Sequence, residues 1–256
     1  MEKHINSNTD ALIKRISQNS SKSKIDLDEW ILQHLNIPKT KIDILDLGCG
    51  TGKQIFNLIP HLSEESSITG FDISEQAVSE VINKARSNGY KNIFCTKGDL
   101  DNCLNVFKGN KYDIIISTYA IYYSRNIKKL LIELEKLLKE NGKMFISGYG
   151  KSSNKEIIDL SNQFISSSAN PINQIENFIS DTDLAEISKH YNKCETFELN
   201  NEIKFHSADD VLIWWRNHSL YSKEIEKNIV KWLRTYFAEN THYYLTKNVF
   251  GVKISL

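Results

Sequence analysis

Short apolar runs alternate with segments of helical period between residues 42 and 150. The apolar runs are nearly continuous, which is typical of strands that are buried on both faces of a parallel sheet. They cover residues 42–47, 66–72, 91–99, 112–120 and 143–150. Repeated alternation of this kind predicts an α/β fold with a doubly wound, mostly parallel sheet.

The segments between these runs carry signals for the start and the end of helices. Ser74 is placed to cap a helix that stops at Gly89. Ser124 or Asn126 caps a second helix, which we expect to end at Gly142. Sheets of this class bind ligands at the carboxyl ends of their strands. The residues just after each strand are therefore the first candidates for a site.

The pattern changes after residue 150. A polar stretch that is rich in serine and asparagine and has only weak helical period runs to residue 179. Beyond it the periodicity predicts helices over residues 181–191, 207–221 and 225–237, an alternating strand over 193–205 and a closing strand over 242–256.

The composition is that of an ordinary globular protein. The chain has 256 residues, and its 32 Lys and Arg balance its 32 Asp and Glu. This neutrality gives no footprint for nucleic acid or for an anionic membrane surface. No apolar run approaches the roughly 18 residues of a membrane span, and the first ten residues lack the apolar core of a signal peptide. The four cysteines have no metal-site spacing, so we expect reduced thiols, no metal and a cytoplasmic location.

A glycine-rich loop follows the first apolar run in the stretch ILDLGCGTGK, residues 44–53. The phosphate-binding P-loop is excluded, because Gln54 stands where a Ser or Thr is required. The dinucleotide pattern G-x-G-x-x-G fits poorly, because Lys53 takes its last position. The carboxylate of Asp46 at the strand end would repel a pyrophosphate. The loop therefore suits a ligand with positive charge and no phosphate, and S-adenosylmethionine, with its sulfonium and ammonium groups, is such a ligand.

Acidic residues also close the next two strands. Asp72 follows the second strand, where a carboxylate can accept hydrogen bonds from two ribose hydroxyls. Asp99 follows the third strand and can accept from an adenine amino group. Leu100 and Ile73 are the apolar neighbours that we expect on the two faces of the adenine ring.

The stretches LDLGCGTGK, GFDIS, KGDL, YDIIIS and LLKENGKMFIS together resemble the class I S-adenosylmethionine-dependent methyltransferases of small-molecule type. The resemblance covers about residues 41–150. It implies a Rossmann-like, seven-stranded sheet with helical cap insertions, S-adenosyl-L-methionine as the cofactor and a small-molecule methyl acceptor. It divides the chain into an N-terminal helical segment and candidate lid (1–40), a cofactor-binding core (41–150), and the remaining core strands with the substrate cap (151–256).

The resemblance also assigns residues to the cofactor. Gly48 and Gly50 line its methionine end, while Asp72 binds the ribose and Asp99 the adenine. Cys49 belongs to the same loop, where its side chain is expected to fill space. The end of the fourth strand meets the cofactor and the incoming substrate, and its residues are Ser117, Thr118 and Tyr119.

Aromatic side chains are the candidates for contact with the acceptor. Many small-molecule members of the family carry histidines where Tyr122 and Tyr123 stand. This departure makes His218 a candidate base, together with the two tyrosines. Trp214 lies four residues before His218, so both share one helix face. We predict Tyr122, Tyr123 and His218 as catalytic, and Tyr119, Trp214 and Trp215 as substrate-binding; the alternative is that these side chains belong to the core.

The leading hypothesis is transfer of a methyl group to a nitrogen or oxygen of a small molecule. A tRNA or protein methyltransferase is the first alternative, although the Asn/Asp-Pro-Pro-Tyr signature of amino-methylating enzymes is absent. The second alternative is an enzyme of the same fold that uses S-adenosylmethionine without methylating an acceptor. No membrane partner is expected, a nucleic-acid partner is disfavoured by the charge balance, and the oligomeric state stays open.

Overall fold

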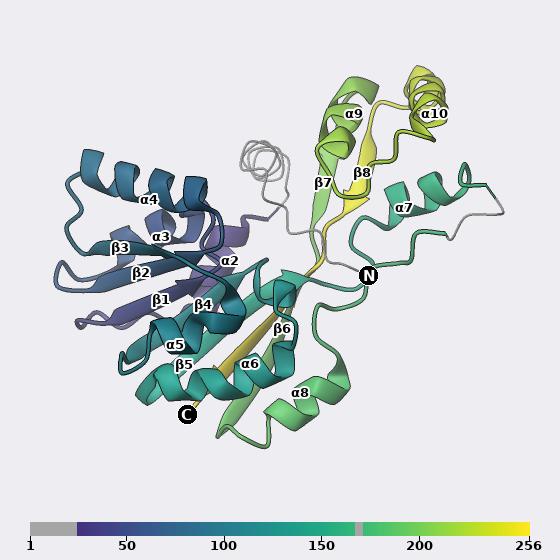
Figure 1. Cartoon of the computed structure of the whole chain (residues 1–256). Helices are drawn as coiled ribbons and strands as arrows, with labels where there is room; N and C mark the ends of the chain where they lie inside the picture. The colour runs from purple at the N-terminus through teal and green to yellow at the C-terminus, as the bar shows by residue number, and fades with distance from the viewer. Residues whose placement is uncertain (1–24, 167–170) are drawn as a thin grey trace.

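The computed structural model describes residues 25–166 and 171–256, and it shows a seven-stranded sheet with helices on both faces (Figure 1). The strand order is β3-β2-β1-β4-β5-β9-β6. The first five strands pair in parallel, and β9 runs antiparallel to both β5 and β6. The bounds are β1 Asp43–Leu47, β2 Ser67–Asp72, β3 Ile93–Lys97, β4 Tyr112–Thr118, β5 Leu138–Tyr149, β6 Lys193–Leu199 and β9 Val249–Ser255. The predicted doubly wound, mostly parallel α/β fold is confirmed.

Three helices cover one face of the sheet. They are α2 (Leu27–Leu35), α3 (Lys53–Leu58) and α4 (Glu75–Ser87), and their apolar side chains join those of the central strands in one core. Trp30 of α2 lies directly on β9, where a Cβ atom added to Gly251 would come within 2.6 Å of the tryptophan ring. Only glycine allows this close approach of helix and strand.

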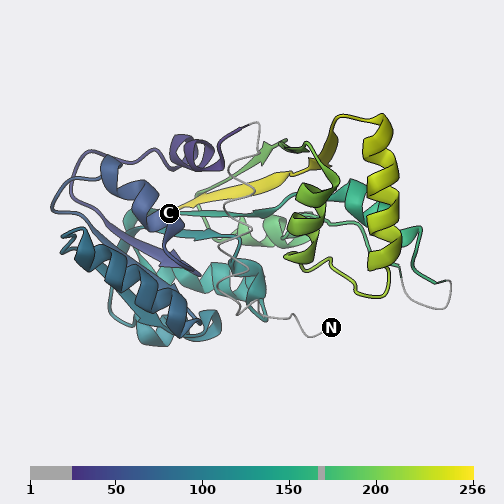
Figure 2. The same ribbon diagram turned by 90° about the horizontal axis from the view of Figure 1, so that it is seen from above.

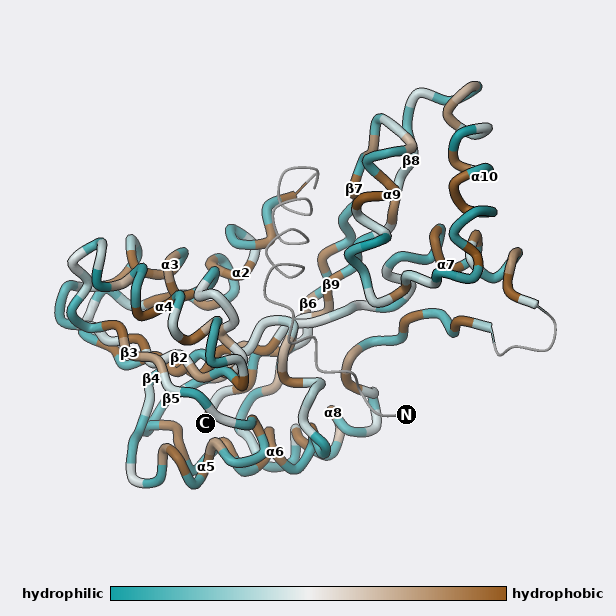
Figure 3. Tube along the Cα trace, turned by 45° about the horizontal axis from the view of Figure 1, so that its top comes forward, coloured by the Kyte–Doolittle hydropathy of each residue, from teal (hydrophilic) through white to brown (hydrophobic). Residues whose placement is uncertain are grey.

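Three other helices cover the opposite face: α5 (Cys103–Val106), α6 (Ile127–Glu133) and α8 (Asp181–Ile187). They close a second apolar core against the other side of the same strands. Figure 3 shows hydrophobic residues, in brown, on the strands and at intervals along the helices that flank them. Burial on both faces explains why these strands are nearly continuous apolar runs in the sequence.

The helix signals in the sequence are mostly confirmed. Ser74 Oγ accepts a hydrogen bond from Ala77 N, and Gly89 takes a left-handed φ of 76° just after α4. Asn126 caps α6 by accepting from the backbone amide of Lys129. The prediction that Gly142 ends this helix is wrong. A 3₁₀ turn over Leu134–Leu137 follows α6, and the chain then enters β5 at Leu138, which pairs with Tyr112 of β4.

A second, two-stranded sheet forms a separate lobe with three helices (Figures 1 and 2). We call this part the small lobe. It consists of α7 (Lys155–Asn162), β7 (Glu202–Phe205), α9 (Ala208–Arg216), α10 (Glu226–Glu239) and β8 (Tyr243–Thr246). Its buried side chains make a third apolar core of their own. In Figure 1 the small lobe stands beyond the carboxyl ends of the parallel strands.

Two strands that the sequence predicts as continuous are each divided between the two sheets. The expected strand over 193–205 breaks into β6 and β7, and the expected strand over 242–256 breaks into β8 and β9. At the break the carbonyl of Asn201 accepts from Lys247 N, while the side chain of Asn201 bonds the backbone of Ile25. The apolar–polar alternation continues across both breaks, so periodicity alone does not reveal them.

The expected N-terminal helical segment over residues 1–40 lies only partly within the described residues. Its described part contains α2, and residues 1–24 lie outside. Its role as a lid stays a prediction. In residues 25–166 and 171–256 no helix is both long and apolar enough to cross a bilayer.

Candidate active site

The glycine loop joins β1 to α3 at the carboxyl edge of the sheet. Gly48, Gly50 and Gly52 have φ values of 75°, 51° and 80°, a left-handed conformation that favours glycine. The amides of Gly48 and Cys49 both donate to the carbonyl of Phe71 in β2, at 2.7 and 3.1 Å. On the other side, a Cβ atom on Gly48 would lie 2.0 Å from Ala120 Cβ. The loop is therefore held tightly between the ends of β2 and β4.

Asp46 is a buried carboxylate at the end of β1, with 1% of its surface exposed. Neither of its side-chain oxygens has a hydrogen-bond partner among the described residues. Burial, together with the nearby charge of Asp72, raises the pKa of Asp46 from 3.8 to about 8. An isolated buried charge is costly, and a cationic ligand group next to Asp46 would remove that cost.

Asp72 bonds the glycine loop directly, a contact that sequence reasoning missed. Its Oδ2 accepts from Gly50 N at 2.8 Å, and its Oδ1 accepts from Ser74 N at 2.9 Å. Each carboxylate oxygen can accept more than one hydrogen bond, so the side chain can still receive ribose hydroxyls. Ile73 beside it is 41% exposed, which is unusual for isoleucine and leaves an apolar face open.

Asp99 and Leu100 follow β3, next to Asp72 across the β2–β3 pair. The Oδ1 atom of Asp99 accepts from Asp101 N at 2.9 Å and so caps the 3₁₀ turn Leu100–Asn102. Asp99 is exposed, and Leu100 is half-buried against the core. The two side chains thus lie at the expected strand end, and one oxygen of Asp99 is engaged in a local cap.

The end of β4 brings two polar residues to opposite faces of the sheet. Ser117 is fully buried, and its hydroxyl donates to the carbonyl of Leu47 at 2.7 Å, which ties β4 to the start of the glycine loop. Thr118 is half-buried on the other face, beside Ser147 of β5. The hydroxyl of Ser147 is buried and has no hydrogen-bond partner within the described ranges. Sequence reasoning missed Ser147, although it stands at the carboxyl end of a strand.

The side chain of Cys49 in the glycine loop contacts a second cysteine, which lies in β3. Its Sγ lies 3.6 Å from Sγ of Cys95 in β3, and both are free thiols. The contact with Cys95 and burial raise the pKa of Cys49 well above its ordinary value. Cys49 is therefore a protonated, space-filling side chain rather than a nucleophile.

Tyrosines gather at the carboxyl ends of β4 and β5. The Tyr149 ring lies 5.1 Å from that of Tyr119 and 5.6 Å from that of Tyr122, which is 4.8 Å from Tyr123. We call these four residues the tyrosine cluster. Tyr119 takes an unusual φ of 55°, and its amide donates to Ser147 O at 2.7 Å. Burial raises the pKa values of Tyr119 and Tyr122 far above 10, so these phenols stay neutral. Sequence reasoning missed Tyr149.

Trp214, Trp215 and His218 lie in the small lobe on or just after α9. Trp214 and Trp215 are fully buried, and the ring of His218 stacks on Trp214 at 4.6 Å. The Nε1 of Trp215 donates to Leu220 O, and the Nδ1 of His218 accepts from Leu220 N. These contacts fit the core alternative. Trp214 is linked toward the tyrosine cluster through Lys247, whose Nζ lies 5.6 Å from the Trp214 ring and 5.5 Å from that of Tyr149.

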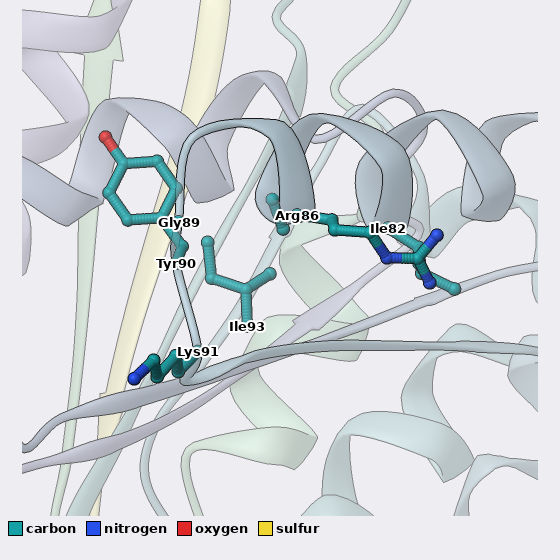
Figure 4. A pocket seen from close by; sticks show the side chains of 7 residues that line it. Ile82, Arg86, Gly89, Tyr90, Lys91 and Ile93 are labelled. Atoms are coloured by element: carbon teal, nitrogen blue, oxygen red, sulfur yellow. The ribbon is translucent and has the colours of Figure 1, made fainter.

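A separate surface pocket of about 380 Å³ lies between the end of α4 and the start of β3 (Figure 4). Ile82, Arg86 and Tyr90 line it, among others. This is the amino edge of the sheet, opposite the glycine loop, so the pocket contains none of the candidate residues. Within the described residues no group of three His, Cys, Asp or Glu side chains is arranged to hold a metal ion.

Comparison with known proteins decides the family. A family model described as a methyltransferase domain matches residues 38–230, well over half of the chain. The chain belongs to this methyltransferase family. Its cofactor is S-adenosylmethionine, and the site fits that molecule, because the partnerless Asp46 carboxylate is suited to a cationic group.

The names of similar proteins indicate different methyl acceptors. Malonyl-[acyl-carrier protein] O-methyltransferase 2 of Ilyobacter polytropus is 27% identical over 187 residues, which are 68% of this methyltransferase and 67% of that protein. Ribosomal RNA large subunit methyltransferase G of Vibrio cholerae is 27% identical over 125 residues, 46% of this chain but only 32% of its own length. This methyltransferase therefore spans about a third of that relative.

Solved structures share the fold at low sequence identity. The YcgJ protein of Bacillus subtilis superposes with a TM-score of 0.61 at 14% identity, over 89% of this chain and 97% of that one. Phosphoethanolamine N-methyltransferase 2 of Haemonchus contortus, in complex with phosphomonomethylethanolamine and S-adenosylhomocysteine, has a TM-score of 0.59 at 15% identity. That match covers 98% of this chain and 57% of the other. The Rossmann-like methyltransferase fold is thus shared with both.

Proposed function

We propose that this methyltransferase transfers the methyl group of S-adenosylmethionine to a nitrogen or oxygen of a small-molecule acceptor. The observation that carries the proposal is the tyrosine cluster. It lies beside the glycine loop, since Ala120 follows Tyr119 directly and touches the loop at Gly48. Aromatic rings gathered beside a cofactor loop are suited to contact with a small organic molecule, and we call the place where it would bind the proposed acceptor pocket.

The chain's own residues bind and orient the two reactants. Asp46 and the loop residues Gly48, Cys49 and Gly50 would hold the methionine end of the cofactor, and Asp72 its ribose. Ile73, Asp99 and Leu100 would surround the adenine, and Ser117 and Thr118 would close the site at the end of β4. Methyl transfer from a sulfonium is an in-line displacement, so alignment of the nucleophile and exclusion of water are the main tasks of the protein.

The tyrosine cluster would hold the acceptor. Because Tyr119 and Tyr122 have raised pKa values, they can donate or accept hydrogen bonds but cannot serve as phenolate bases. An acceptor whose nucleophile is already deprotonated needs no base. Where a base is needed, His218 stays the candidate, with Trp214 and Trp215 as substrate contacts from the small lobe, which would then act as the cap.

The nucleic-acid alternative has little support in the charges. The sequence offers scattered basic pairs such as Lys128–Lys129, and Lys128 Nζ lies 2.6 Å from Glu186 and 3.7 Å from Asp183. These carboxylates neutralise the lysine where an RNA-binding surface would need it free of local acids.

The proposal is tested by measuring which class of molecule receives a labelled methyl group. The purified protein is incubated with methyl-labelled S-adenosylmethionine and a cell extract that has been separated into small-molecule, RNA and protein fractions. The proposal predicts label in the small-molecule fraction, with one S-adenosylhomocysteine formed per methyl transferred. Label in RNA or protein would contradict it. Consumption of the cofactor without S-adenosylhomocysteine would support the non-methylating alternative.

A further inference from the structure

A lysine is buried between the two lobes. Lys247 lies in the turn between β8 of the small lobe and β9 of the main sheet, and it is 7% exposed. Its Nζ lies 5.6 Å from the ring of Trp214 in the small lobe and 5.5 Å from the ring of Tyr149 in the tyrosine cluster. The positive charge of Lys247 is therefore placed at one side of the proposed acceptor pocket.

Lys247 lies over Tyr149, and the sheet register puts Tyr149 on the same face as Asp46. Asp46, Thr118, Ser147 and Tyr149 occupy the same face of β1, β4 and β5, because β1 pairs with β4 and β4 with β5 in the recorded register. The ammonium group of Lys247 lies 5.5 Å from the ring of Tyr149 and so adds a positive charge to this row of polar side chains.

Asn154 supplies a second donor at the same place. It precedes α7, is fully buried, and has a left-handed φ of 60°. Its Oδ1 accepts from Lys247 Nζ at 3.3 Å, while its Nδ2 has no hydrogen-bond partner within the described residues. The two ends of an amide are close together, so this buried N–H donor lies next to the ammonium group. A buried donor without an acceptor destabilises the protein, and a ligand oxygen that accepts a hydrogen bond from it would remove this penalty.

The turn that carries Lys247 is rigidly held. The amide of Asn154 donates to Thr246 O at 2.7 Å, and the amide of Lys247 donates to Asn201 O at 2.7 Å. Glu156 accepts from both the amide and the hydroxyl of Thr246. A cation and an amide donor fixed side by side form a preorganised site for oxyanions.

We propose that Lys247 and Asn154 bind an anionic group of the methyl acceptor, either a carboxylate or a phosphate. This inference rests on the proposed function and deepens it by naming the substrate class. The nucleophile of such an acceptor lies toward Tyr119 and its anionic group toward Lys247. An acceptor that presents a cation to Tyr149 is disfavoured, because the ammonium of Lys247 already lies against that ring and would repel it.

Anion binding to substituted proteins tests this proposal. Sodium acetate and inorganic phosphate are titrated by calorimetry into the unliganded protein and into its complex with S-adenosylhomocysteine. The variants are Lys247→Met, which keeps the length of the side chain without its charge, and Lys247→Arg, which keeps the charge. Asn154→Asp removes the Nδ2 donor, and Lys227→Met on the exposed side of α10 is the matched control.

The wild-type protein should bind at least one of the two anions with saturation. Lys247→Met and Asn154→Asp should weaken this binding at least tenfold, whereas Lys247→Arg and Lys227→Met should change it less than threefold. Tighter binding of phosphate or of acetate identifies the anionic group. Absence of saturable binding to the wild type, or equal affinity in Lys247→Met, overturns the proposal. Failure of the wild type to bind S-adenosylhomocysteine counts against the proposed function instead, since the anion titration of the unliganded protein stands by itself.

Discussion

At the scale of single residues, the central feature is a carboxylate that is buried before its ligand arrives. Asp46 has no hydrogen-bond partner among the described side chains and backbone groups, and its pKa is about 8. Most buried polar groups in proteins are paired, so an orphaned carboxylate at a glycine loop indicates a ligand site. The same residue must lower the stability of the unliganded protein near neutral pH.

The raised pKa of Asp46 makes the free energy of unfolding depend on pH, and Asp46→Asn should remove this contribution. The folded protein keeps the proton of Asp46 up to about pH 8, whereas the unfolded chain releases it near 3.8. Between these values the folded state binds one more proton, so stability falls as pH rises, by up to about 1.4 kcal/mol per pH unit. Urea unfolding at several pH values in this window should show a smaller slope for Asp46→Asn than for the wild type. Parallel stability curves would contradict the assigned protonation.

Gly48→Ala should disrupt the loop through a collision. The added Cβ would lie 2.0 Å from Ala120 Cβ, and the left-handed φ of 75° adds strain. Gly89→Ala is a matched control, since Gly89 has φ 76° and no atom within 4 Å of its Cβ position. We expect Gly89→Ala to cost about 1–2 kcal/mol from backbone strain alone, and Gly48→Ala to cost more and to lose cofactor binding. Equal losses of stability in urea would argue against the tight fit of the loop.

At the scale of secondary-structure elements, Asp72 connects the end of β2 to the glycine loop and to the start of α4. Asp72→Ala removes the acceptors for Gly50 N and Ser74 N together with the proposed ribose contact. Each hydrogen bond to a charged group contributes roughly 1.5–3 kcal/mol, so the affinity for S-adenosylmethionine should fall at least tenfold. Asp99→Ala should weaken it less, because Asp99 is exposed. Calorimetry on both variants checks the order, and a change under twofold for Asp72→Ala would reject its role.

The sequence predicts the elements whose formation depends on residues close together in the chain. The buried strands appear as apolar runs, and the caps at Ser74 and Asn126 follow from side-chain chemistry. The breaks near Asn201 and Lys247 depend on hydrogen bonds between segments that are far apart in the chain. For the same reason Asp46 and Asp72 could be placed from their motif, whereas Ser147, Tyr149 and Lys247 required the folded chain.

At the scale of the whole molecule, the main sheet and the small lobe divide the work. The carboxyl edge of the sheet provides the glycine loop and the acids, while the turn between β8 and β9 brings Lys247 between Tyr149 of the tyrosine cluster and Trp214 of the small lobe. Both chain crossings are fixed by hydrogen bonds between segments, including those of Asn201 and Glu156. These hydrogen bonds hold residues from distant parts of the chain together at the place where we propose that the acceptor binds.

The most direct measurement is a calorimetric titration of S-adenosylmethionine into the wild-type protein and into Asp46→Asn. The account predicts one binding site in the wild type and an affinity at least tenfold lower in the variant, because a neutral amide cannot balance the cationic ligand. Equal affinities in the two proteins would contradict the role of Asp46, and so would a wild type that ignores S-adenosylmethionine but binds NAD or ATP.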